Sequence, residues 1–238
     1  MKLHNKGTNM PYFGALDQDY TNPYAAGELK IKKSFYIKYV KRTIDIIVSL
    51  LAIILTLPIN LIIAVLTLFD LGQPVFFVHE RPGLGEIPFR IIKFRNMTMD
   101  TDENGDLLPP DERITSLGKL LRKTSLDELL QFGLIFTGKM SLIGPRPLLM
   151  KYLPRYNKRQ HMRHAVRPGL ECPMPDYAGD EVSWEERLEN DVWYVENISF
   201  RTDCIMLFRL VRLVFNRKRA KIRGERIDGE FMGTLEVK

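Results

Sequence analysis

Residues 44–69 read IDIIVSLLAIILTLPINLIIAVLTLF, and this stretch decides the fold. It is 26 residues long, and Asp45, close to its beginning, is its one charged residue. A helix needs about 20 predominantly apolar residues to span a bilayer. A helix in a soluble core would carry polar residues at regular spacing over such a length. The stretch therefore predicts a helical segment in contact with a membrane.

Pro58 lies near the middle of this stretch. Proline removes one helical hydrogen bond and clashes with the preceding turn, so the helix must kink or break there. Each half alone is too short to span the hydrocarbon. Basic residues, which favour the cytoplasmic side, stand on both flanks. They are Lys30, Lys32, Lys33, Lys38, Lys41 and Arg42 before the stretch, and Arg81, Arg90, Lys93 and Arg95 after it. The pattern fits a hairpin that enters and leaves by one face, and it equally fits a kinked transmembrane helix.

The composition sets wide limits on function. The 238 residues suffice for one domain with a sizeable core plus further segments. A net charge of +6 suits nucleic acid, a phosphorylated substrate or an anionic lipid surface. Cys172 and Cys204 are too few for a disulfide framework or a thiolate metal site. Because residues 1–36 are polar and rich in turns, we expect an N-terminal arm there and no cleavable signal peptide.

Two short strands are expected after the apolar stretch, over residues 75–79 and 89–94. Alternation along the second strand puts Lys93 and Arg95 on one face and Arg90 on the other. Two cations on one strand face could hold a diphosphate. They could equally form a solvated edge.

Residues 113–147 read RITSLGKLLRKTSLDELLQFGLIFTGKMSLIGPRP and carry the candidate chemistry. Ser125 and Glu128 form a capping-box pattern, which predicts that a helix begins at Ser125. Asp127 and Glu128 would then lie in its first turn, where the helix dipole alone favours acidic residues. Alternatively the two carboxylates, with Arg122 shortly before them, form a nucleophile and metal site beside free backbone amides. The pattern alone favours the capping interpretation.

Two prolines enclose Arg146 in the sequence GPRP at residues 144–147. They restrict the backbone, so that the guanidinium projects in a set direction and can contact phosphate through two nitrogens. The alternative is a rigid turn with an exposed arginine.

Two helices are expected near the C-terminus. Ser183 and Glu186 form a second capping box. The helix that it opens has one apolar face, made of Leu188, Val192 and Val195. Residues 200–215 predict a basic amphipathic helix, followed by a basic tail over residues 217–238. Such a helix suits an anionic lipid surface, and a core-packed helix with a solvated tail fits the pattern as well.

Taken together, these blocks resemble the bacterial sugar transferase family, the monotopic polyprenyl-phosphate sugar-1-phosphate transferases of glycan initiation. They occur in family order and spacing between about residue 41 and residue 215. The matching segments are KRTIDIIVSL, PVFFVHERPGLGEIPFRIIKFRNM, RITSLGKLLRKTSLDELLQ, GKMSLIGPRPLL, VRPGL and SWEERLENDVWYVENISF.

The resemblance implies an α+β fold, with a helix-rich compact catalytic domain of few short strands at residues 73–216. Interfacial helices and a re-entrant helix-break-helix anchor at residues 37–72 would hold this domain on the membrane, with the membrane break at Pro58. It further implies residence at the cytoplasmic face of the bacterial inner membrane.

The resemblance also implies a ping-pong reaction. Asp127 would attack the β-phosphate of a UDP-sugar and release UMP, and polyprenyl (undecaprenyl) phosphate would then take the sugar-1-phosphate from Asp127. An ionised carboxylate suits this role as a nucleophile. Glu128, together with Asp127, would bind Mg²⁺, which neutralises charge on the diphosphate. The phosphate-binding residues implied are Arg122, Arg146, Lys93 and Arg95.

Two positions depart from the family pattern. The family usually has Ser-Pro where this chain has Leu57-Pro58, and Thr56 is the nearest hydroxyl. Within residues 171–180 the usual glutamine and arginine are replaced by Pro175 and Gly179, which puts the nucleotide-sugar specificity in question.

The altered loop is the best argument for an alternative function, a non-catalytic membrane adaptor of the same fold that recruits partners through its basic surface. No nucleic-acid recognition motif is present in the sequence. The identity of the sugar, the glycan pathway and the formation of a homo-oligomer do not follow from the sequence.

Overall fold

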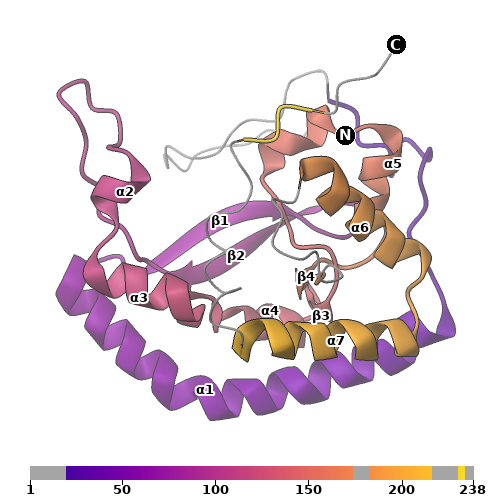
Figure 1. Cartoon of the computed structure of the whole chain (residues 1–238), viewed down its shortest axis with the longest axis horizontal. Coiled ribbons are helices and arrows are strands. Elements are labelled where there is room, and N and C mark those ends of the chain that lie inside the picture. The colour runs from indigo at the N-terminus through magenta and orange to yellow at the C-terminus, as the bar shows by residue number, and fades with distance from the viewer. Residues whose placement is uncertain (1–19, 174–182, 216–229, 234–238) are drawn as a thin grey trace.

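The computed structural model describes residues 20–173, 183–215 and 230–233. Its longest element is the 31-residue helix α1 (Lys41–Leu71), which follows the π-helical turn η1 (Tyr36–Val40). α1 lies along one side of the molecule, and α7 (Phe200–Phe215) runs beside part of it (Figure 1). The predicted helix at residues 200–215 is therefore confirmed.

α1 passes through Pro58 without interruption, so the predicted break is wrong and the kink remains. Figure 1 shows a bowed helix that changes direction near its middle. Proline has no N–H for the carbonyl four residues earlier and pushes the preceding turn away, which bends a helix without ending it. Thr56 donates its hydroxyl hydrogen to the carbonyl oxygen of Ala52 at 2.7 Å, a contact that also favours bending.

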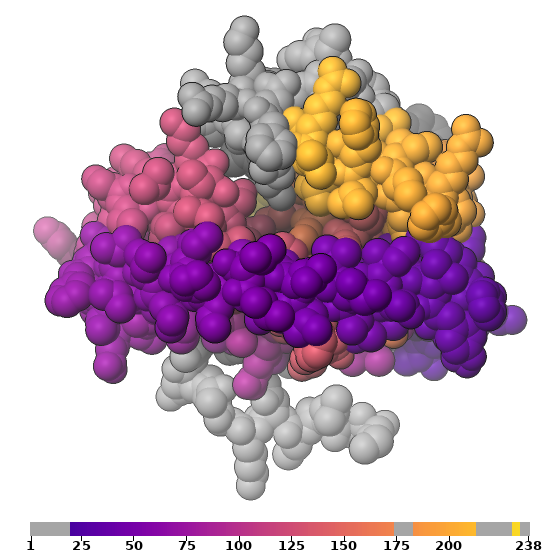
Figure 2. Space-filling view, turned by 90° about the horizontal axis from the view of Figure 1, so that it is seen from below, coloured from indigo at the N-terminus to yellow at the C-terminus, as the bar shows by residue number. Residues whose placement is uncertain are grey.

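The surface of α1 is largely apolar and exposed. Within the described residues, Tyr36–Leu71 is one helical stretch long and apolar enough to cross a membrane, with a mean hydropathy of 2.8 and 11% of its most apolar window buried. Leu51, Leu55, Leu61 and Phe69 are each more than half exposed. Figure 2 shows α1 running across the whole width of the underside. A soluble core helix would bury such side chains, so the helix points to association with a membrane.

Polar contacts fasten both ends of α1 to the rest of the molecule. Near its beginning, Asp45 accepts a hydrogen bond from the Ser141 hydroxyl at 3.0 Å. At its far end, Asp70 accepts one from the Thr115 hydroxyl at 2.6 Å. Both ends therefore lie against one folded body, although 31 helical residues measure about 46 Å along the axis when straight.

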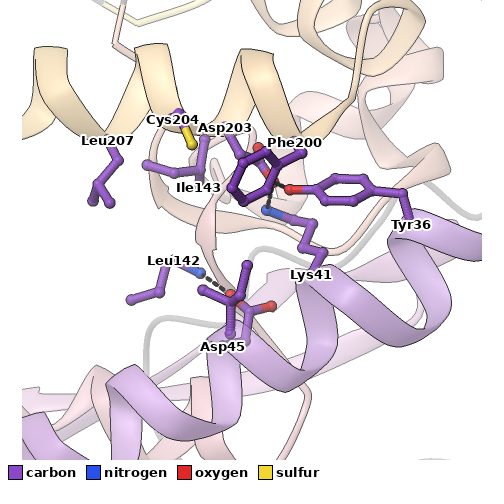
Figure 3. A pocket seen from close by; sticks show the side chains of 10 residues that line it. Tyr36, Lys41, Asp45, Leu142, Ile143, Phe200, Asp203, Cys204 and Leu207 are labelled. Atoms are coloured by element: carbon purple, nitrogen blue, oxygen red, sulfur yellow. Dashed lines mark hydrogen bonds and ion pairs between the residues drawn. The ribbon is translucent and has the colours of Figure 1, made fainter.

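A cavity of about 160 Å³ lies between α1 and α7. In Figure 3, Lys41 reaches Asp203 on α7 at 2.8 Å, and the Tyr36 hydroxyl donates to the same carboxylate at 2.5 Å. Most of the other residues that line the cavity are apolar. None of the site residues expected from the sequence lines the cavity. These contacts make the cavity part of the joint between the two helices.

Within the described ranges, the strands form two small sheets. β1 (Phe76–Pro82) and β2 (Pro88–Phe94) make an antiparallel hairpin, closed by the short helix η2 (Leu84–Glu86). β3 (Ser141–Ile143) and β4 (Gly169–Glu171) pair in parallel. The expectation of few short strands is thus confirmed, and the first strand runs three residues beyond its expected end at residue 79.

The register of the hairpin decides which side chains share a face. Phe77 is opposite Lys93, and Arg81 is opposite Phe89. Residues directly opposite one another in an antiparallel pair lie on the same face, as do alternate residues of one strand. His79 and Arg81 therefore share a face with Lys93.

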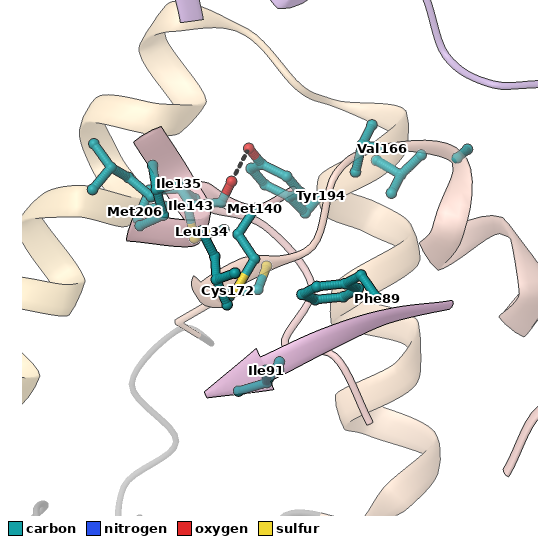
Figure 4. Packing of buried hydrophobic residues seen from close by; sticks show 13 residues of the cluster. Phe89, Ile91, Leu134, Ile135, Met140, Ile143, Val166, Cys172, Tyr194 and Met206 are labelled. Carbon is teal, nitrogen blue, oxygen red and sulfur yellow. Dashed lines mark hydrogen bonds between the residues drawn. The ribbon is translucent and has the colours of Figure 1, made fainter. Parts of the chain in front are cut away.

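The remaining elements make the structure helix-rich, as expected. They are α2 (Pro110–Arg113), α3 (Ser116–Thr124), η3 (Leu126–Glu128), α4 (Gln131–Phe136), η4 (Met150–Arg155), α5 (Lys158–His161), η5 (Met162–Ala165) and α6 (Trp184–Glu196). The main core, drawn in Figure 4, joins β2, α4, β3, α6 and α7. Ile135, Met140, Tyr194 and Met206 are completely buried in it.

Both C-terminal helices keep their expected faces. Ser183 and Glu186 form the predicted capping box of α6, whose apolar face is buried. On α7, Met206 is buried whereas Phe208 and Val211 are exposed, so part of the apolar surface of α7 is not used for packing. This favours the lipid-facing interpretation of that helix over the fully packed one.

Parts of three expected features lie outside the described residues. These are residues 1–19 of the N-terminal arm, residues 174–180 of the atypical loop, and the basic tail apart from residues 230–233.

Candidate active site

The Asp127 carboxylate lies in the interior, with 5% of the residue exposed. Asn96 donates a hydrogen bond from its side-chain nitrogen to Asp127 Oδ2 at 3.0 Å. Burial, and then the neighbouring Glu128, raise the pKa of Asp127, whereas Lys93 and Arg122 oppose this rise. Asp127 is thus a sheltered carboxylate with two cations close by.

The chain around Asp127 differs from the expected helix start. Ser125 does not open a helix: it ends α3 in the left-handed conformation, with φ of 57°, and its side chain makes no capping hydrogen bond. Such a residue terminates a helix and redirects the chain. Asp127 and Glu128 then occupy the single 3₁₀ turn η3 before α4 begins at Gln131. The predicted capping box at Ser125 is wrong, and the dipole of a long helix does not account for the two acids.

Asn96 is held in place by the close approach of α3. A Cβ atom on Gly118 would lie 2.0 Å from the Asn96 carbonyl oxygen, so no larger residue fits at that position. No charge or spacing signal in the sequence singles out Asn96. Its position directly after β2, within the motif IKFRNM, was the available hint.

Glu128 forms an ion pair with Arg146. Arg146 also donates to the carbonyl oxygen of Leu170 at 3.1 Å and lies 3.8 Å from the Glu171 carboxylate. Burial would lower the pKa of Arg146, but Glu128 and Glu171 outweigh this effect, and the net direction is upward. Arg146 is therefore more than the exposed arginine of a rigid turn, because it joins η3 to β4.

A buried ion pair supports the backbone at Arg146. Arg163 is 1% exposed and donates to Asp191 Oδ2 on α6 at 2.6 Å. The same guanidinium donates to the Arg146 carbonyl oxygen at 2.7 Å. A Cβ on Gly169 would lie 2.2 Å from the backbone nitrogen of Gly144, so only glycine allows β4 to approach this segment.

The other expected phosphate-binding cations divide into two groups. Burial lowers the pKa of Lys93, and Glu128 and Asp127 oppose that change, so Lys93 lies within electrostatic reach of the carboxylate pair. Arg122 is within electrostatic reach of Asp127. Arg95 turns away and donates to the carbonyl oxygens of Leu71 and of Gly72, the latter at 3.0 Å.

The placement of Arg95 has a simple cause. Regular alternation would keep Arg95 on the face of Lys93, but β2 ends at Phe94, so the alternation stops before Arg95. The C-terminal carbonyls of a helix lack internal partners, and a guanidinium can satisfy several of them. Arg95 thus holds the C-terminal end of α1, and the structure does not place it beside the carboxylates.

Two further residues lie at the site that the sequence patterns did not select, His79 and Arg81. Arg81 is close enough to Arg146 and Glu128 for their charges to affect its pKa, and His79 is similarly close to Lys93. The pairing of two strands around the turn RPGLG was the signal that could have found them.

Two adjacent carboxylates are one of the donor sets through which proteins bind Mg²⁺. Among the described residues, no group of three or more His, Cys, Asp or Glu side chains could hold a metal ion. Mg²⁺ commonly binds proteins through one or two carboxylates and takes its other ligands from water and substrate phosphates. Asp127 and Glu128 supply such a pair, so the residues present fit the ion.

Comparison with known proteins identifies the family of the chain. A family model described as "Bacterial sugar transferase" matches residues 36–217, which include α1, the carboxylate pair and α7. The chain belongs to the bacterial sugar transferase family. In this sugar transferase, the family region thus includes the membrane helix as well as the site.

Three relatives show the range of the family. The chain is 43% identical over 174 residues to the "Uncharacterized sugar transferase EpsL" of Bacillus subtilis, covering 73% of this chain and 86% of that protein. It is 35% identical over 184 residues to the UDP-N-acetylgalactosamine-undecaprenyl-phosphate N-acetylgalactosaminephosphotransferase of Aeromonas hydrophila, covering 74% and 44%. It is 32% identical over 197 residues to the undecaprenyl-phosphate galactose phosphotransferase of Salmonella typhimurium, covering 76% and 41%. The chain thus spans less than half the length of these two relatives with named activities.

Proposed function

We propose that this sugar transferase moves a sugar-1-phosphate from a UDP-sugar to undecaprenyl phosphate and releases UMP, as a membrane step of bacterial polysaccharide synthesis. The observation that carries the proposal is the buried Asp127 carboxylate, hydrogen-bonded to Asn96 and neighboured by Glu128 and two cations. The names of the Aeromonas and Salmonella relatives support undecaprenyl phosphate as the acceptor.

In the first half-reaction, an Asp127 oxygen attacks the β-phosphorus of the UDP-sugar. A new bond forms between this oxygen and phosphorus, and the bond from phosphorus to the oxygen bridging the two phosphates breaks. UMP leaves with that bridging oxygen and its electron pair, and the sugar phosphate stays on Asp127. Burial makes the carboxylate more basic than an ordinary aspartate, and Lys93 and Arg122 favour its ionised form.

In the second half-reaction, a phosphate oxygen of the lipid attacks the same phosphorus. The bond between phosphorus and Asp127 breaks, the carboxylate is restored, and the sugar is left on a lipid diphosphate. Asp127 and Glu128 would hold Mg²⁺, which would neutralise part of the diphosphate charge. Arg146 orients Glu128 through their ion pair.

The membrane helix enters and leaves by the same face, which is the cytoplasmic face of the inner membrane. The contacts at Asp45 and Asp70 support this, because both join α1 to one folded body. A crossing helix would put its two ends on opposite sides of the hydrocarbon, where one folded body could not contact both of them. The basic residues on both flanks support the cytoplasmic side.

Asp127→Asn provides the decisive test. The variant should fold and bind membranes but release no UMP from a UDP-sugar, and it should form no protein-bound sugar phosphate. In the wild type without lipid acceptor, a rapid quench should trap a sugar-phosphate mass on the peptide containing Asp127. Asp106→Asn, in an exposed loop, is the matched control and should react normally.

The same experiment separates the enzyme from an adaptor. Glu128→Gln should slow both half-reactions and weaken their dependence on Mg²⁺, while Asp127 can still be modified. If Asp127→Asn turns over at nearly the wild-type rate, the catalytic assignment fails and the non-catalytic membrane adaptor takes its place.

A further inference from the structure

The guanidinium of Arg81 contains a buried hydrogen-bond donor that has no acceptor among the described residues. Its Nε atom is buried and has no hydrogen-bond partner in the described part of the chain. A buried donor that has lost water without gaining an acceptor costs free energy, more so on a charged group. An unsatisfied cation of this kind is an open position for an anion.

His79 shows the same condition on the same face of β1. Its Nδ1 atom is buried and unpartnered among the described residues. Burial, followed by the charges of Arg81, Lys93 and Arg146, lowers the pKa of His79 to about 3. The imidazole is therefore neutral at physiological pH, and it can donate or accept one hydrogen bond without adding charge.

Arg81 lies within electrostatic reach of two groups of the proposed active site, Arg146 and Glu128. Burial, and then the like charge of Arg146, lower the pKa of Arg81 to about 10, so the guanidinium is charged at neutral pH. Tyr152, Tyr156 and Glu128 oppose this change. A second cation beside Arg146 is unfavourable in the empty protein and becomes favourable when an anion lies between or before them.

Arg146 is already occupied, and this distinguishes the two arginines. Its guanidinium is shared between Glu128 and the carbonyl oxygen of Leu170. If phosphate took these nitrogens, Arg146 would lose contacts that hold Glu128. Arg81 would give up no hydrogen bond from its Nε.

We infer that Arg81 binds a phosphate group of the substrate in front of Asp127 and Glu128, with His79 as a neutral hydrogen-bonding neighbour. The inference rests on the proposed function, and it assigns to β1 a role in substrate binding. The ligand is a phosphate ester, either the diphosphate of the nucleotide sugar or the monophosphate of the lipid. Arg146 then serves to position Glu128.

The test compares Arg81→Met and Arg81→Lys in the full chain, purified in lipid nanodiscs. Arg90→Met is the matched control, since Arg90 lies on the neighbouring strand and is exposed. Its Nε atom lies 3.9 Å from Glu80 Oε1, which makes a weak surface ion pair. Titration calorimetry with Mg²⁺ measures binding of UDP and of uridine. If the bound phosphate belongs to the nucleotide sugar, Arg81→Met should weaken UDP binding at least tenfold and leave uridine binding unchanged. Arg81→Lys keeps the positive charge but loses the planar guanidinium, so its UDP affinity should lie between those of the wild type and Arg81→Met. Arg90→Met should bind UDP as the wild type does.

Separate half-reactions identify the source of the phosphate. A raised KM for the UDP-sugar in UMP release indicates the nucleotide diphosphate, and a raised KM for polyprenyl phosphate alone indicates the lipid. Either result supports the inference. Unchanged values of both KM and of UDP affinity in Arg81→Met overturn it, and so does an equal loss of UDP and uridine binding, which would mark a structural role.

Failure of this inference is distinct from failure of the proposed function. A wild-type protein that releases UMP while Arg81→Met performs identically refutes the role of Arg81 alone. A wild-type protein that neither binds UDP nor releases UMP refutes both.

Discussion

The guanidinium of Arg163 donates a hydrogen bond to the backbone carbonyl oxygen of Arg146 at 2.7 Å, while it is paired with Asp191. A charge buried deep in the core thus holds the main chain of a residue at the candidate site. The side chain of Arg146 in turn holds Glu128. The position of Glu128 therefore depends on an ion pair two steps away from it.

Asp191→Asn should destabilise the protein by about 3–5 kcal/mol, because it leaves Arg163 as a buried charge without a counter-charge. Chemical denaturation measures the loss. Glu189→Gln on the same helix is the matched control: its pair with Arg159 is about half exposed, and the expected loss is below about 1 kcal/mol. Equal losses of stability in the two variants would show that the buried ion pair contributes no more than the exposed one.

Gly118→Ala should displace Asn96, because the new Cβ would clash with the Asn96 carbonyl oxygen. Asn96 holds Asp127, so UMP release should fall by more than the loss of folded protein explains. Gly133→Ala is the control, since a Cβ there meets no atom within 4 Å. Gly133→Ala should stabilise α4 by up to about 1 kcal/mol. Normal UMP release by a folded Gly118→Ala variant would contradict the role of Asn96.

Asp127→Asn should raise the thermal unfolding midpoint at neutral pH without Mg²⁺. Burial and Glu128 raise the pKa of Asp127 in the folded state above its unfolded value, so ionisation opposes folding. This penalty is fully present above the folded pKa and disappears as the pH falls through it toward the unfolded pKa. The advantage of Asp127→Asn should therefore shrink on acidification, whereas UMP release by the wild type should decline over the same window. A gain that grows as the pH falls would reverse the sign and refute the argument.

Arg146→Lys should reduce activity although it keeps the positive charge. A lysine lacks the planar fork that serves Glu128 and the Leu170 carbonyl together. We expect weaker binding of the nucleotide sugar and a reduced kcat, measured by UMP release over a range of UDP-sugar concentrations. Wild-type kinetics in this variant would leave Arg146 with the role of a rigid turn alone.

Single cysteines at Lys33 and Glu103 should both resist an impermeant periplasmic reagent in intact cells, because both ends of α1 lie on the cytoplasmic side in the proposed topology. Both residues are exposed and lie on opposite sides of α1 in sequence. The background must carry Cys204→Ser, since that thiol is exposed in the wild type. Labelling of one site alone would establish a crossing helix.

The sequence predicted the elements more accurately than the local geometry around the acids. The apolar stretch, the hairpin strands and the capping box at Ser183 all follow from local patterns, and each is present. The prediction of a helix start at Ser125 was wrong, although a serine three residues before a glutamate fits a capping box. In the structure Ser125 adopts the left-handed conformation and ends α3.

The site itself depends on contacts between distant segments. Asn96 meets Asp127 because Gly118 lets α3 approach, and Arg81 faces Lys93 because of the hairpin register. No periodic pattern in the sequence predicts either of these two relationships. Strand alternation wrongly kept Arg95 beside Lys93, since alternation ends with the strand.

The fastening of both ends of α1 has a mechanical consequence for the membrane. In the proposed topology α1 enters and leaves by one face and occupies volume in a single leaflet, so it would expand that leaflet relative to the other. Bilayers that already curve toward the protein have room for this wedge, and amphipathic elements at membrane surfaces respond to curvature for the same reason. The bowed α1, held at Asp45 and at Asp70, would thus make the enzyme partition toward strongly curved membrane, independently of its substrates.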